Sequence, residues 1–262
     1  MVLRRMLQAL GVGGPSVETV LRTPACRPGG FLEGVVHVHG GERTVDVEYV
    51  AAALTTRVGA PPLDDAPPTA QEFHRKRLTG SFRLVPGAAH EIPFRIDVPW
   101  ETPITDLYGQ RLHGMSMALA TELEVGGQVE RDDLDAVAVH PLPAQERILD
   151  ALLRLGFRFQ HAGVVRGRIP ALPQELPFHQ GIGFAPPAAY ALGVEQFELI
   201  FVPSPEVLQV IFEVDRRGGV FTSAHDAFGR LEVDYGTAAE VDWVDRLGGW
   251  LSGVARRGGL VR

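Results

Sequence analysis

A few residues in this sequence stand at spacings that could support chemistry. Gly114 to Ala118 read Gly-Met-Ser-Met-Ala, which resembles a nucleophile elbow. Such an elbow places its serine on a sharp turn between a strand and a helix, whereas Ser116 lies within a strand-like alternation. His37 and His39 point to one face of a predicted strand, but the sequence places no third metal ligand beside them. We therefore expect an exposed sheet face there, and no catalytic residue, metal or cofactor.

A third candidate is the acidic cluster of Asp132, Asp133 and Asp135. Carboxylate oxygens could bind Ca²⁺, but these spacings are not those of an EF-hand loop. A solvated turn is the simpler interpretation of the cluster.

Apolar periodicity predicts that strands dominate the first half of the chain. A helical stripe over residues 1–13 gives way to period-2 alternation over residues 31–39, 45–54, 91–98 and 115–125. A change of phase near Val50 predicts a β-bulge. Pro93 cannot donate a ladder hydrogen bond, so its strand should lie at a sheet edge or be bulged. Residues 14–142 are predicted to form one β-sandwich.

The second half begins with a predicted helix over residues 143–156, framed by Pro143 and Gly156. Alternation resumes over residues 197–201, 208–214 and 231–235 and predicts a second sandwich over residues 157–237. Apolar residues at helical spacing then predict a basic helical tail over residues 238–262. The fold class expected is mostly β, with two consecutive sandwiches, a short N-terminal helix, a connecting helix and a C-terminal helix.

Composition narrows the function classes. Hydrophobic residues make up 45% of the 262 residues, which is enough for one large core or two ordinary ones. A net charge of −7 argues against nucleic-acid binding. Cys26 is the single cysteine, which excludes an internal disulfide and fits a reducing compartment. No apolar run reaches the roughly 20 residues that span a bilayer, so a cytoplasmic location is expected.

The order of short motifs along residues 1 to about 219 resembles the bacterial SpoOM sporulation-control family, which has an arrestin-like fold. Each motif is only a strand with a turn, and the specificity comes from their order. The motifs are Gly11-Val12-Gly13, Pro28-Gly29-Gly30, Gly34 to Gly41, Ile92-Pro93-Phe94, Val98-Pro99, Thr102 to Thr105, Val139 to Leu142, Leu155-Gly156-Phe157, Leu176-Pro177-Phe178, Phe197 to Phe201, Val207-Leu208 and Phe212 to Arg217.

The resemblance implies a non-catalytic cytoplasmic regulator that acts as an adaptor through protein–protein interaction, in sporulation or in cell-envelope or division physiology. The alternatives are a hydrolase with an unrecognised site between the sandwiches and a peripheral membrane module for sorting or cargo binding. The resemblance also suggests that Asp133 or Asp135 pairs with Arg216 or Arg217 across the domain interface, since arrestin-like folds can lock their domains with buried ion pairs. Solvated arginines at a hairpin are the simpler alternative.

Both termini are basic in an otherwise acidic chain, and the first has an apolar stripe. Such ends could contact protein partners or, weakly, an anionic membrane at the inner face of the cell. The simpler interpretation is that the stripe packs on a sandwich or on a second subunit of a homo-oligomer. The residues concerned are Leu3, Arg4, Arg5, Met6, Leu7, Leu10, Arg256 and Arg257.

The membrane interpretation predicts that deleting residues 1–13 and 246–262 abolishes co-sedimentation with anionic liposomes, because both basic ends are then missing. Binding that is unchanged by the deletion contradicts that interpretation.

Overall fold

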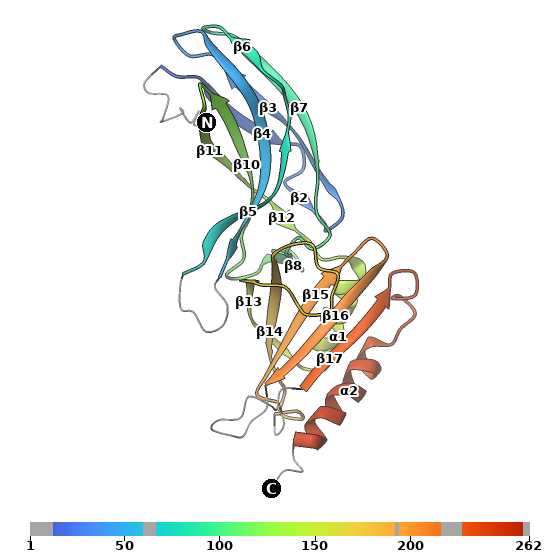
Figure 1. Cartoon of the computed structure of the whole chain (residues 1–262). Helices are drawn as coiled ribbons and strands as arrows, with labels where there is room; N and C mark the ends of the chain where they lie inside the picture. The colour runs from blue at the N-terminus through green and yellow to red at the C-terminus, as the bar shows by residue number, and fades with distance from the viewer. Residues whose placement is uncertain (1–12, 60–66, 192–193, 216–226, 259–262) are drawn as a thin grey trace. The chain divides into compact units, whose positions relative to one another are not determined.

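The computed structural model describes residues 13–59, 67–191, 194–215 and 227–258 (Figure 1). The chain forms two compact units. The first contains the described parts of residues 1–57, 68–105 and 116–140, and the second those of 58–67, 106–115 and 141–262. The described residues of segments 58–67 and 106–115 therefore belong to the second unit, although they fall inside the range predicted for the first sandwich. The predicted helix over residues 1–13 lies almost entirely outside the described residues.

The first unit contains a three-stranded and a five-stranded sheet. The three-stranded sheet has the order β1 (Ser16–Leu21), β3 (Phe31–His39), β7 (Ala89–Asp97). The other has the order β11 (Gln128–Ala136), β10 (Met117–Val125), β4 (Val45–Val58), β5 (Thr69–Arg77), with β6 (Phe82–Leu84) paired to β4. Two short strands, β2 (Ala25–Cys26) and β12 (Ala138–Val139), pair in parallel.

The local features predicted for these strands are confirmed. β7, which contains Pro93, lies at an edge of its sheet. The register between β10 and β4 shifts opposite Glu48, so the bulge lies two residues from the predicted position. In β3 the buried residues alternate with partly exposed ones, as the sequence predicts, and Leu32 and Val36 are in the core.

Side chains bridge strands that are not paired with each other in this unit. The carboxylate of Asp133 on β11 accepts a hydrogen bond of 2.5 Å from the backbone N–H of Thr19 on β1. The Nζ of Lys76 on β5 donates one of 2.8 Å to the carbonyl of Arg95 on β7. Backbone groups on β1 and β7 thereby gain partners without a further strand.

The second unit contains one five-stranded antiparallel sheet, a short hairpin and two helices in its described part (Figure 1). The sheet runs in chain order through β13 (Arg158–Arg166), β14 (Phe178–Ala185), β15 (Gln196–Pro203), β16 (Val207–Asp215) and β17 (Ala227–Asp234). The hairpin joins β8 (Asp106–Leu107) to β9 (Gln110–Arg111), and the helices are α1 (Pro143–Arg154) and α2 (Trp243–Gly258).

The mostly β class is confirmed, and in the described part of the second unit helix α2 packs on the sheet. The ring of Trp250 on α2 packs 5.3 Å from the ring of Phe212 on β16 and 6.5 Å from that of Phe197 on β15. A helix therefore covers this face of the sheet. Alternation along a strand indicates that one face is buried, and it does not indicate what covers that face.

A buried carboxylate lies in the five-stranded sheet of the first unit. Glu122 on β10 is fully buried and forms an ion pair with Arg75 on β5. The guanidinium of Arg75 also donates a hydrogen bond of 2.8 Å to the hydroxyl of Tyr49 on β4. Removing one partner of such a pair leaves an uncompensated buried charge.

Replacing Arg75 by Met should lower the free energy of unfolding by about 3 kcal/mol, because the buried Glu122 then loses its ion-pair partner. The double variant Glu122→Leu/Arg75→Met should recover most of that loss. Urea titration followed by circular dichroism measures both. Arg83→Met is the matched control, because its ion pair with Asp46 is exposed and should matter little. Equal losses for Arg75→Met and Arg83→Met would contradict the role given to Glu122.

Candidate interaction surface on helix α1

Helix α1 is fixed by its own end signals and by its apolar face. Pro143 stands in the first turn, and the side chain of Gln145 accepts a hydrogen bond of 2.7 Å from the N–H of Leu142. Gly156 ends the helix at φ 89°. Ile148, Leu149 and Leu152 are fully buried along one side. The opposite side presents exposed side chains to solvent, among them Arg147, Asp150, Leu153 and Arg154.

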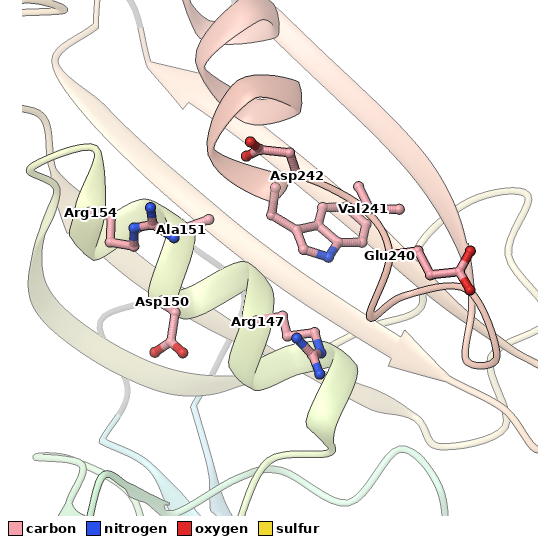
Figure 2. Close-up of a pocket in the computed structure, with 8 residues that line it drawn as sticks. Arg147, Asp150, Ala151, Arg154, Glu240, Val241 and Asp242 are labelled. Carbon is pink, nitrogen blue, oxygen red and sulfur yellow. The ribbon is translucent and has the colours of Figure 1, made fainter.

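A polar groove of about 330 Å³ lies between α1 and the start of α2 (Figure 2). Arg147 and Arg154 line it from α1, and Glu240 and Asp242 from the α2 side. Asp242 caps α2, because its carboxylate accepts hydrogen bonds from the N–H groups of Val244 and Asp245. Asp150 lines the α1 wall as well, so that wall carries both signs of charge while the other is acidic, and the groove is suited to polar ligands.

An apolar pocket of about 240 Å³ lies on another side of α1, against the β8–β9 hairpin. Leu149 and Phe184 line it and are 0% and 1% exposed. Tyr108 and Leu153 line it as well, yet are 56% and 41% exposed. The pocket thus combines buried apolar residues with apolar side chains that reach solvent.

Tyr108 occupies a strained position at the tip of the hairpin. Its φ is 52° and that of Gly109 is 74°, as a type I′ turn requires at both central residues. This left-handed conformation costs a residue other than glycine roughly 1–2 kcal/mol, and the cost is smallest for asparagine. The Tyr108 hydroxyl donates a hydrogen bond to the Asp150 carboxylate of α1. Partial burial and that carboxylate raise the pKa of Tyr108, so the phenol stays protonated at neutral pH.

The structure accounts for some of the residues singled out in the sequence. His37 and His39 lie on β3 and are partly exposed, and among the described residues no three His, Cys, Asp or Glu side chains could hold a metal ion. Ser116 directly precedes β10, and its carbonyl accepts a hydrogen bond of 2.8 Å from Thr56. Burial raises the pKa of the Cys26 thiol to about 12, so this thiol is a poor nucleophile at neutral pH.

The predicted ion pairs and terminal contacts stay predictions. Asp133 bonds to Thr19 within the first unit, and Asp135 follows it on β11. Arg216 and Arg217 lie outside the described residues, as do Leu3, Arg4, Arg5, Met6, Leu7 and Leu10. The backbone of Arg256 and Arg257 belongs to α2.

Sequence reasoning missed Tyr108, Arg111 and Leu153. The signal was the pair Tyr108-Gly109 between Leu107 and Gln110, since a two-residue turn ending in glycine predicts a hairpin. The pocket itself could not be found that way, because it combines the hairpin, α1 and two strands that are separate in the sequence.

Comparison with known proteins agrees with this fold. The model of the family described as SpoOM protein matches residues 3–218, most of the chain. The chain belongs to the SpoOM protein family. It is 34% identical over 215 residues to the sporulation-control protein spo0M of Bacillus subtilis strain 168, covering 82% of this chain and 80% of that protein. It is also similar to the crystal structure of Spo0M from Bacillus subtilis, with a TM-score of 0.79 and 29% identity over 93% of this chain and 100% of that one.

The family match distinguishes the two cavities beside α1. Every residue that lines the apolar pocket falls within residues 3–218, whereas Glu240 to Trp243 of the polar groove lie beyond them. The apolar pocket therefore lies wholly within the segment that the SpoOM family model matches. No helix among the described residues is long and apolar enough to cross a membrane.

Tyr108→Asn should keep the thermal midpoint of unfolding unchanged or raise it, because asparagine suits this left-handed position better than tyrosine. The loss of the bond to Asp150 offsets part of that gain. Differential scanning calorimetry measures the change. A clear drop in the midpoint would show that the Tyr108 side chain stabilises the fold by more than its left-handed backbone conformation costs, and would contradict this prediction.

Proposed function

We propose that this protein is a non-catalytic regulator of the sporulation-control type, and that it acts by binding other proteins through the surface of α1 and the β8–β9 hairpin. The regulatory part of the proposal is supported by the relative named as a sporulation-control protein. The binding part is supported by the apolar pocket and its exposed rim.

The observation that carries the proposal is an exposed aromatic side chain kept in a strained conformation next to an apolar pocket. Strained residues persist where the surrounding structure holds them, and they cluster at binding and active sites. Aromatic side chains are enriched at the centres of protein interfaces, because they bury a large area with few rotatable bonds. Tyr108 has both properties, since it is strained and reaches solvent beside Leu153.

The size of the pocket favours a protein partner over a cofactor. Sites for small molecules and cofactors have volumes of about 300–1,000 Å³. The pocket measures about 240 Å³, which is room for one large side chain. Such pockets hold the anchor residues of protein interfaces, while flatter contacts around them exclude water.

Site-specific photo-crosslinking in the host cell tests the proposal. A benzophenone amino acid placed at Leu153 should give discrete adducts with other proteins, because this side chain is exposed on the rim of the pocket. The same amino acid at Leu134 is the matched control, since Leu134 is 57% exposed on β11 of the first unit. Adducts at neither position, or the same adducts at both, would contradict a partner surface on α1.

A further inference from the structure

We propose that the apolar pocket beside α1 takes one aromatic or large aliphatic side chain from a partner protein, presented by a peptide segment with acidic residues next to that side chain. This inference rests on the proposed function and names the chemistry of the partner at that surface.

The apolar part of the inference comes from what lines the pocket. Leu149 and Phe184 are buried and offer no polar side-chain atom. The ring of Tyr108 and the side chain of Leu153 stand at the opening, where they would close over an inserted side chain. An aromatic guest could stack with Tyr108 in an offset or edge-to-face arrangement, and an aliphatic one would gain burial alone.

The acidic part of the inference comes from the charges at the opening. Arg111 lines the pocket from β9 and is exposed, and within the described residues nothing forms a hydrogen bond or ion pair with its guanidinium. Three carboxylates lie near the opening: Asp150 accepts the hydrogen bond from Tyr108, and Asp106 and Glu146 have interactions of their own. A carboxylate from the partner would therefore meet Arg111, in a charge-assisted and often bidentate hydrogen bond.

The hairpin fixes where these groups stand. Asp106 pairs with Arg111 and Leu107 with Gln110 in the β8–β9 ladder, so Arg111 lies a few residues from the Tyr108 tip. The bond from Tyr108 to Asp150 ties that tip to α1. The anchor pocket and the cation are thus held side by side before a partner arrives, which lowers the entropy cost of binding.

Selection from a random 12-residue peptide display library against the full chain tests the inference, because the library offers many side-chain chemistries to the pocket at once. Peptides that also bind the Leu153→Asp variant are removed. The expected result is enrichment of one Phe, Trp, Tyr or Leu with Asp or Glu within a few positions. Enrichment of basic sequences, of sequences without an apolar anchor, or of none would overturn the proposal.

Affinities of the enriched peptide, measured by fluorescence polarisation, then separate the two parts of the inference. Leu153→Asp should weaken binding about tenfold or more, because it places a charge at the anchor. Arg111→Glu should weaken it about threefold, as expected for an exposed pair, and should favour a version of the peptide with Lys in place of its acids. Tyr108→Asn should weaken binding while the fold is retained. Leu134→Asp is the matched control and should bind like the unchanged protein.

Three outcomes would overturn the inference in different ways. Equal binding by Arg111→Glu and the unchanged protein would remove the acidic requirement. A dimer in sedimentation that Leu153→Asp dissociates would make a second copy of this chain the occupant. Binding to phosphatidylglycerol vesicles that is lost in Leu153→Asp would show that the pocket contacts a membrane and not a partner protein.

If crosslinks form at Leu153 in cells but no acidic peptide is selected, the proposed function stands and this inference fails. If no crosslinks form there, the proposed function itself fails.

Discussion

The second unit depends on the packing of α1 through Ile148, Leu149 and Leu152. All three side chains are fully buried, and each contributes roughly 1.5–3 kcal/mol through the area it removes from water. Both the polar groove and the apolar pocket are lined by residues of α1, so both depend on its position. The polar groove lies where α2 begins beside α1, and the apolar pocket lies between α1 and the β8–β9 hairpin, whose Tyr108 donates a hydrogen bond to α1. Leu149 belongs both to the buried face of the helix and to the lining of the pocket, so the core and the candidate site share a residue.

In the first unit, by contrast, polar side chains make contacts between strands. Its sheets carry a buried carboxylate, Glu122, beneath a guanidinium and a tyrosine hydroxyl, and it satisfies strand N–H and C=O groups with Asp133 and Lys76. Burying Glu122 costs desolvation, and its ion pair with Arg75 offsets that cost only while both partners are present. The backbone strain at Tyr108, by contrast, lies at an exposed turn. Asparagine would fit that turn with less strain, yet the chain has tyrosine there. Under the proposed function, the strained Tyr108 serves partner binding.

Much of the local structure was predictable because local rules decide it. The bulge near Val50, the edge position of Pro93 and the ends of α1 each follow from a few neighbouring residues. The family followed from the order of weak motifs along most of the chain. The layer that covers the second sheet was not predictable, because the apolar face of β16 would look the same beneath a helix as beneath another sheet. The pocket was missed for a related reason, since Tyr108, Leu153 and Phe184 are brought together only by the fold.

Hydrogen exchange read by mass spectrometry tests the central claim most directly, namely that partners dock on α1 and the β8–β9 hairpin. The full chain is measured alone and with a saturating acidic peptide that carries one apolar anchor. The account predicts slower exchange in residues 106–113 and 146–155, with residues 31–39 of the first unit unchanged. Protection confined to the first unit, or spread evenly over the chain, would contradict it.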